Sequence, residues 1–392
     1  FRTMPLVLAE FGLALTVVML AGALAQTTPA IHDQPVWHLP FRVSWEAAWD
    51  AWPDALYGAF ALFLAGVALA MLVLPSHRGH TVTEARAVVL GVVALGGASA
   101  ALYWLSVPAY PDTYRRSDVP YLAASVHQGQ RLYQAHCVDC HGVAGYGDGA
   151  LAGSLPVPPA DLSEPHTALH TAGDMFWWFT HGIPESGMPG FANALSEQDR
   201  WDLVNFLRAF SQGFEARVLR ETIIPRDPWL GAPNFYFRGE SGYSELKALR
   251  ETHTVLLVFG RADHKQSRLR LLQLRHELSR QPVPGLKVLV VPTQADNSWH
   301  SLSPLQLVQS ESSSIWATYS LLSRSLADRG DDNALGVQRS HVEFLIDRFG
   351  YVRARWVPGE SDGWSDLDHL RTQVAALMRE PEIEPPPDDH VH

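Results

Sequence analysis

Cys137, Cys140 and His141 are the residues of this chain whose types and spacing most clearly predict a chemistry. They form a Cys-x-x-Cys-His motif, and the 392-residue sequence contains no other cysteine. The motif is typical of covalent haem attachment, because two thioethers hold the porphyrin edge while the adjacent histidine reaches the iron. A zinc site would need a second pair of ligands, and a thioredoxin-type redox pair would follow a strand. The motif therefore predicts one c-type haem.

The second axial iron ligand must come from further along the chain, and Met188 is the best candidate. Glycine and proline surround it in Gly187-Met188-Pro189-Gly190, and they fix a loop that can hold a thioether over the haem. Met175 is an alternative, although its aromatic neighbours favour the core of a helix. Bis-histidine ligation is the other alternative, with the candidates His166, His170 and His181.

Two helices are predicted to position these residues. The stretch 121–136 has amphipathic spacing and delivers Cys137 at its end. The stretch 196–210 is expected to close the domain, with Ser196 as its cap and Asp199 at the capping-box position.

Residues 121 to about 210 resemble class I cytochrome c domains. Besides the haem motif and the methionine loop, the resemblance is carried by Gly142, by Gly145-Tyr146-Gly147-Asp148-Gly149 and by Pro159-Ala160-Asp161-Leu162. It implies an all-α fold with haem c bound at Cys137 and Cys140, and with His141 and Met188 as axial ligands. It also implies that a proline carbonyl orients the histidine ring, the candidates being Pro156, Pro158 and Pro159.

Three apolar segments precede this domain, at about 6–24, 57–74 and 87–107, and each approaches the ~20 residues of a bilayer helix. Arg2, Arg78 and Arg86 place the chain start and the second connection in the cytoplasm by the positive-inside bias. Everything after Val107 then lies outside, where covalent haem attachment takes place. We therefore expect a multi-pass protein of the bacterial inner membrane with its haem in the periplasm.

The loop between the first two segments contains His32 and His38, and imidazole side chains suit copper. Two histidines six residues apart in a loop more often have no special role. Residues 28–37 and Pro40-Phe41-Arg42 resemble the copper-resistance protein D (CopD) family, whose members with a fused haem domain share the junction Ala109-Tyr110-Pro111 and Val119-Pro120-Tyr121. The resemblance covers residues 1 to about 120 and implies handling or transport of copper across the inner membrane.

The last third of the chain predicts an α/β domain. Strands are expected at 254–259, 286–291, 341–346 and 352–357, with a basic helix at 265–280 and a closing helix at 364–378. This order, β-α-β, helix, β-β-α, resembles a thioredoxin-like domain, and Phe344–Gly350 looks like the strand-turn of its Sco-type and peroxidase-like branches. The nucleophile position, 260–265, has no cysteine, so thiol chemistry is excluded and a docking scaffold remains. Copper binding by His341, His390 and His392 is an alternative, less favoured than a strand-edge histidine and a disordered tail.

The expected organisation is a membrane region at 1–107, a linker at 108–120, the cytochrome c domain at 121–212, a connector at 213–242, the thioredoxin-like domain at 243–380 and an acidic, histidine-containing tail at 381–392. The formal charge of -11 argues against nucleic acid as a partner.

Three functions are compatible with these features. The first is a membrane-anchored cytochrome that exchanges single electrons with periplasmic or membrane redox partners, in connection with copper. The second is a copper transporter with a redox haem, and the third is an electron-transfer subunit of a larger respiratory oxidase complex. The sequence shows no bond-making residues, which favours an electron-transfer protein over a stand-alone enzyme.

Overall fold

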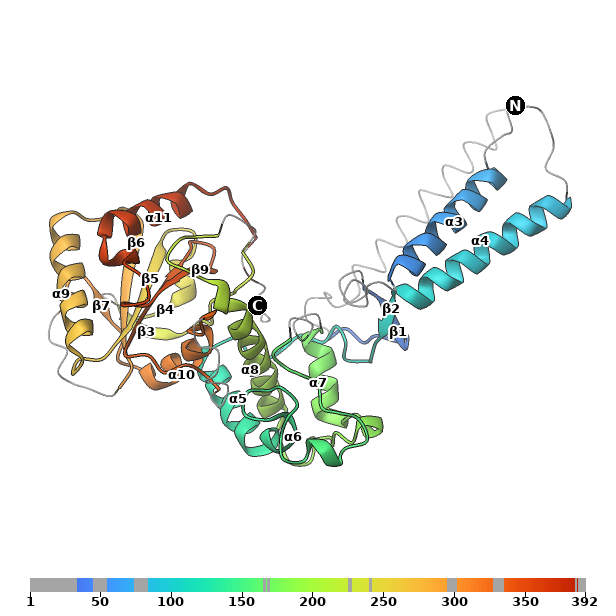
Figure 1. Cartoon of the computed structure of the whole chain (residues 1–392), viewed down its shortest axis with the longest axis horizontal. Coiled ribbons are helices and arrows are strands. Elements are labelled where there is room, and N and C mark those ends of the chain that lie inside the picture. The colour runs from blue at the N-terminus through green and yellow to red at the C-terminus, as the bar shows by residue number, and fades with distance from the viewer. Residues whose placement is uncertain are drawn as a thin grey trace, which may run out of the picture.

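The computed structural model describes residues 34–44, 55–73, 84–164, 167, 170–224, 228–239, 242–294, 302–326, 335–384 and 386. Three parts follow one another along the chain: a pair of apolar helices, a helical domain and an α/β domain (Figure 1).

The apolar pair consists of α3 (Ala55–Val73) and α4 (Glu84–Leu105), which pack along each other. A Cβ on Gly97 would lie 2.8 Å from the carbonyl oxygen of Ala61, so this contact requires a small residue. Large apolar side chains on the pair are exposed, among them Phe63 at 64% and Leu95 at 72%. An apolar surface of this extent is suited to a membrane rather than to water.

Of the three predicted membrane spans, one has the length and apolarity of a bilayer helix within the described residues. It is Val88–Leu105, inside the predicted span 87–107. Helix α3 covers most of the predicted span 57–74, but its apolar part, Leu56–Met71, is shorter. The predicted span 6–24 lies outside the described residues, so a multi-pass topology stays a prediction.

The stretch 108–120, expected to be a linker, is attached to the helical domain. It follows the antiparallel ribbon of β1 (Phe41–Val43) and β2 (Ser106–Pro108). Arg42 in β1 forms a buried ion pair with Asp174 at 3.4 Å, and the Thr113 hydroxyl donates to the same carboxylate at 2.5 Å. Tyr110 stacks on Trp177 with ring centroids 5.6 Å apart. We call these contacts the joint, and they hold the helical domain to the base of the apolar pair.

The helical domain contains α5 (Ala123–His136), α6 (Val138–His141), α7 (Ala172–His181) and α8 (Glu197–Glu215). Short 3₁₀ turns occur at Ala152–Ser154, Pro184–Ser186 and Ala216–Val218. Helices α5 and α8 cross at Gly129, where a Cβ would lie 2.0 Å from the Asp202 carbonyl oxygen, so only glycine permits this approach. The predicted capping box of Ser196 and Asp199 begins α8.

The α/β domain contains a five-stranded sheet in the order β7-β6-β5-β8-β9. Its strands are β5 (Thr254–Gly260), β6 (Leu286–Pro292), β7 (Gln306–Leu307), β8 (His341–Ile346) and β9 (Val352–Trp356). Its helices are α9 (Lys265–Arg280), α10 (Ser312–Leu322) and α11 (Leu367–Arg379). A separate hairpin, β3 (Tyr236–Gly239) with β4 (Gly242–Glu245), and 3₁₀ turns at Leu246–Leu249 and Gly363–Ser365 complete it.

Strand β5 is parallel to β6, which it reaches through α9, and antiparallel to β8, which forms a hairpin with β9. This is the strand order of a thioredoxin-like fold, as predicted. Alternate residues of β5 face two hydrophobic cores: Leu257 packs toward α10, and Leu256 packs toward α9 and α11. Burial on both faces explains why β5 is apolar along its whole length.

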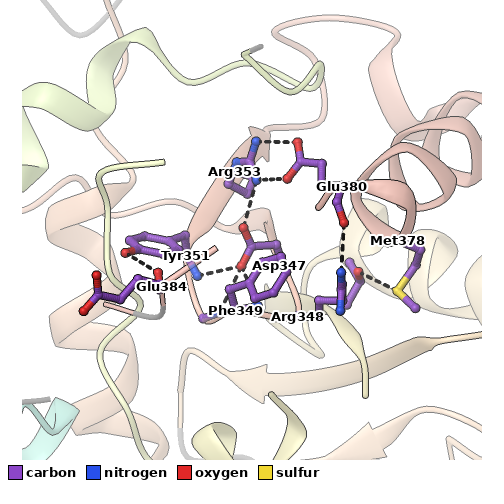
Figure 2. Close-up of polar contacts among 10 residues, drawn as sticks. Asp347, Arg348, Phe349, Tyr351, Arg353, Met378, Glu380 and Glu384 are labelled. Carbon is purple, nitrogen blue, oxygen red and sulfur yellow. Dashed lines mark hydrogen bonds and ion pairs between the residues drawn. The ribbon is translucent and has the colours of Figure 1, made fainter. Parts of the chain in front are cut away.

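The turn between β8 and β9 is held by Asp347 (Figure 2). Its carboxylate accepts hydrogen bonds from the backbone N–H groups of residues 349–351 at 2.9 to 3.0 Å. It also pairs with Arg353 at 2.9 Å, and Arg353 in turn pairs with Glu380 beyond α11. The Phe344–Gly350 sequence is therefore a structural strand and turn that ties the end of α11 to the sheet.

The two domains share an interface in which α10 packs against α5 and α8 (Figure 1). The Thr318 hydroxyl donates to the Ala123 carbonyl oxygen at 2.8 Å in a buried position. A Cβ on Gly213 would lie 2.5 Å from the Leu321 carbonyl oxygen, and the Leu321 side chain belongs to the core of the helical domain. We call this the domain interface, and it makes one packed unit of the two domains.

Candidate functional site

The end of α5 positions the cysteine motif. The backbone N–H of Cys137 donates to the Tyr133 carbonyl, so this cysteine continues the last turn of α5 before α6 begins. The Tyr133 ring is buried against Phe206 of α8, and its hydroxyl donates to the Gly142 carbonyl at 2.6 Å. The crossing of α5 and α8 thus fixes the motif from both of its ends.

Both cysteines are free thiols and half-buried. Burial raises the pKa of Cys137 to about 12, with a further contribution from the neighbouring Cys140. A thiol with such a pKa stays protonated at neutral pH and is a poor nucleophile or zinc ligand. This environment disfavours reversible thiol redox chemistry at Cys137.

His141 is oriented by a backbone carbonyl. Its Nδ1 lies 3.1 Å from the Ala160 oxygen, and because a carbonyl only accepts, Nδ1 is the donor and Nε2 carries the free lone pair. Burial lowers the pKa of His141, which favours the neutral ring that a metal ligand requires. The expectation that the carbonyl of Pro156, Pro158 or Pro159 orients the ring is wrong, because the carbonyl that faces the ring is that of Ala160, the residue after Pro159.

Met188 lies in a short, internally bonded loop after α7. Ile183 and Met188 exchange backbone hydrogen bonds at 2.9 and 3.2 Å, and Gly187 between them has a left-handed φ of 83°. A Cβ on Gly187 would lie 3.1 Å from the Pro156 side chain. The segment 155–160 therefore borders the methionine loop at one end and the His141 ring at the other.

Met188 and Cys137 are both half-buried against the same core of the helical domain. Met175 instead lies inside that core, 4% exposed in α7, as its aromatic neighbours suggested. His170 and His181 pack against indole rings, Trp178 at 4.7 Å and Trp177 at 3.7 Å between centroids. His166 lies outside the described residues.

These residues fit a covalently bound haem. Two thiols stand at the end of α5, an imidazole has its Nε2 free, and a thioether lies in a loop that borders the same segment as the imidazole. Imidazole and thioether are the ligand pair of electron-carrying c-type haems. Cys137, Cys140, His141 and Met188 would hold the group, which supports the sequence prediction without adding a new ligand.

The predicted copper ligands are not gathered in the described part of the chain. His38 is exposed in the segment before β1, and His32 lies outside the described residues. Among the residues that the structure describes, no group of three or more His, Cys, Asp or Glu side chains could hold a metal ion.

His341 is committed to a buried charge network. Its Nε2 lies 3.0 Å from Glu343, whose carboxylate also accepts two hydrogen bonds from Arg270, at 2.7 and 3.0 Å. At the start of α9, the Ser267 hydroxyl donates a hydrogen bond to the Ser340 carbonyl at 2.9 Å. Among the described residues of the α/β domain, the start of α9 has no cysteine, and the His341 ring is already engaged with Glu343.

Three residues that hold the site in place were not predicted from the sequence. The Ala160 carbonyl acts through the backbone and leaves no side-chain signature, and Asp174 reads as an ordinary first-turn acid of α7. Gly129 lies inside an amphipathic helix. An isolated glycine in such a position is a signal of close packing, and it was the one signal available here.

Comparison with known proteins agrees with this geometry. Residues 126–211 match the profile of the cytochrome c family. No curated protein matches the chain. This part of the chain is a cytochrome c domain, and the family implies covalently bound haem c.

Several solved structures are similar to parts of the chain. A putative thiol:disulfide interchange protein DsbE from Chlorobium tepidum is 18% identical, with 39% of this chain and 98% of that chain covered and a TM-score of 0.24. BsSco, a member of the Sco family of cytochrome c oxidase assembly proteins, is 12% identical, with coverage of 40% and 99% and a TM-score of 0.29. A reducing HAO-like protein complex from Kuenenia stuttgartiensis is 25% identical, with coverage of 32% and 60% and a TM-score of 0.20.

Proposed function

We propose that this chain is a membrane-anchored c-type cytochrome that carries one electron at a time outside the cytoplasm. The contact of His141 Nδ1 with the Ala160 oxygen carries the proposal, because it leaves Nε2 available as an iron ligand. The cytochrome c domain favours an extracytoplasmic location, and Val88–Leu105 is apolar and long enough to anchor it in a membrane.

Haem c, attached through Cys137 and Cys140, would supply an iron that accepts and releases one electron. His141 and Met188 would both bind the iron, and the group would then transfer electrons without binding a substrate or oxygen. The protein then acts as a carrier, and its own residues set the potential through the thioether ligand and through burial.

A potentiometric titration of the purified full-length protein, followed by visible absorption, tests this function. We expect a single wave that fits one electron and one haem per chain. A protein without a covalent haem, or a haem that does not respond to potential, would refute the proposal.

A role in copper handling is the more specific part of the proposal. It is supported by the resemblance of residues 28–37 and 40–42 to the CopD family. The described residues add no support, because they contain no group of three or more side chains that could hold a metal ion. Copper uptake by cells that carry the full-length gene, with and without His32→Ala and His38→Ala, is the test. Uptake that is unchanged by both substitutions removes the copper assignment and leaves the electron-transfer assignment intact.

Membership of a larger oxidase complex is a second candidate, favoured by the α/β domain. This domain has a thioredoxin-like fold with no cysteine at 260–265, so docking is the role left to it. Purification from membranes in mild detergent decides between a single chain and a complex of defined composition.

A further inference from the structure

An apolar strip, residues 151–157, crosses the surface between the haem motif and the methionine loop. Its Leu151 and Val157 side chains are 50% and 47% exposed. At one end the N–H of Leu151 donates to the carbonyl of Asp139, which stands between the two cysteines, at 2.7 Å. Near the other end, Pro156 borders Gly187 beside Met188. The strip therefore lies where a protein partner would come near the haem.

The stretch of chain that contains the strip is poor in basic residues. Between residues 132 and 199 the sequence contains no lysine and no arginine, whereas its acidic residues are Asp139, Asp148, Asp161, Glu164, Asp174, Glu185, Glu197 and Asp199. Asp174 and Glu197 are paired with Arg42 and Arg115 from outside this stretch, so the acids that matter here are the exposed ones beside the strip. Asp139 and Glu185 are exposed and stand at the two ends of the strip, and Asp148 is exposed beside Gly142. Such a distribution attracts cationic groups and repels anionic ones.

Other faces of the haem domain are already in use within the chain. Helix α10 covers α5 and α8 through the domain interface, and the joint covers the start of α7. The strip is left exposed, although it contains apolar side chains that favour burial.

We propose that the strip docks a one-electron redox protein whose contact face carries lysine and arginine side chains around its own cofactor. The apolar residues would form the centre of the contact, and the carboxylates of Asp139, Asp148 and Glu185 would steer the basic partner and fix its orientation. This inference rests on the proposed function, because a redox partner is needed only if the haem exchanges electrons.

Stopped-flow oxidation of the reduced full-length protein by two small complexes tests the charge at this surface. The cationic oxidant is tris(phenanthroline)cobalt(III), and the anionic one is hexacyanoferrate(III). We expect rising ionic strength to slow the cationic oxidant and to speed the anionic one.

Charge reversal locates the effect. Asp139→Lys and Glu185→Lys should each slow the cationic oxidant by about threefold at low salt and speed the anionic one. Glu185→Lys, which lies outside the haem motif, should also leave the haem spectrum unchanged. The control is Glu382→Lys, an exposed acid in the segment after α11, which should leave both rates as they are. Two different positions are used so that a defect in haem attachment at Asp139 cannot mimic the result.

Rates with the same salt dependence for both oxidants would overturn the docking proposal, as would Asp139→Lys and Glu185→Lys proteins that behave like Glu382→Lys. In either case the haem would still titrate as a one-electron carrier, so the proposed function would stand. A wild-type protein without a redox-active haem would instead refute the proposed function itself.

Discussion

The His141 ring is held by one hydrogen bond to a backbone oxygen, and this bond decides which ring nitrogen is available. Because Nδ1 donates to Ala160 at 3.1 Å, Nε2 is the nitrogen that can bind iron. A hydrogen bond at Nδ1 also makes the ligand nitrogen more basic and fixes the plane of the ring. No change of the Ala160 side chain should alter this, since the contact is made by the main chain.

Replacement of Met188 by alanine tests the second ligand. We expect Met188→Ala to lose the sulfur-to-iron absorption band at the red end of the visible spectrum. We also expect its reduction potential to fall by on the order of 100 mV, because axial ligands tune haem over ~0.8 V. Met175→Leu is the matched control, since a volume-conserving change in the core should keep the band. A band that survives in Met188→Ala and vanishes in Met175→Leu would transfer the role to Met175.

Glu343 predicts an acid-dependent loss of stability in the α/β domain. Burial by itself would raise its pKa, but Arg270 and His341 outweigh burial and lower the pKa from 4.5 to about 2. A lowered pKa stabilises the fold fully above pH 4.5, and the contribution disappears as the pH falls toward 2. Glu343→Gln should therefore destabilise the domain at pH 7 by roughly 3–5 kcal/mol, because Arg270 is left buried without its partner.

Urea unfolding of wild type and Glu343→Gln at pH 7 and at decreasing pH measures this effect. The difference between the two proteins should shrink between pH 4.5 and 2. A difference that is small at pH 7, or that does not change with pH, would show that the network contributes little.

At the scale of elements, α10 is the helix that serves two domains. One part of it covers the sheet and another packs on α5 and α8, so nearly all of its later residues are buried. Gly213 on α8 allows the closest approach, 2.5 Å from a Cβ at this position to the Leu321 oxygen. A side chain there must push the helices apart.

Gly213→Val should therefore loosen the domain interface without unfolding either domain. We expect amide hydrogen exchange in residues 312–322 to accelerate at least tenfold, which corresponds to ~1.4 kcal/mol of lost protection. Gly153→Val is the control, because a Cβ there meets no neighbour within 4 Å. Exchange in α10 that is equal in the two variants would mean that the interface does not depend on this contact.

Elements with a local sequence pattern were predicted well. The capping box at Ser196 began α8 as expected, and the apolar run at 254–259 became the buried strand β5, because both patterns are local. The cysteines and His141 were found through a fixed spacing. The contact of the 108–120 segment with Asp174 could not be predicted, because Asp174 lies about 60 residues further along the chain and prolines indicate only an extended chain. The residue that orients His141 was also misplaced, because every residue has a backbone carbonyl and no side-chain type marks the one that faces the ring.

For the whole molecule, the contacts run without a break from the apolar helices to the α/β domain. The joint ties the apolar pair to α7, the segment 155–160 links the methionine loop to His141, and the domain interface ties α5 and α8 to α10. The haem domain is thus held between its neighbours on both sides. The α/β domain contributes packing to this arrangement, because α10 contacts both α5 and α8.

The central claim, that the chain carries electrons at an iron ligated by both His141 and Met188, can be tested by one measurement. It is the electron paramagnetic resonance spectrum of the oxidised full-length protein. Two strong protein ligands predict a low-spin signal of the histidine-methionine type and no substantial high-spin component. A dominant high-spin signal would show an open coordination position and would contradict the assignment as an electron carrier.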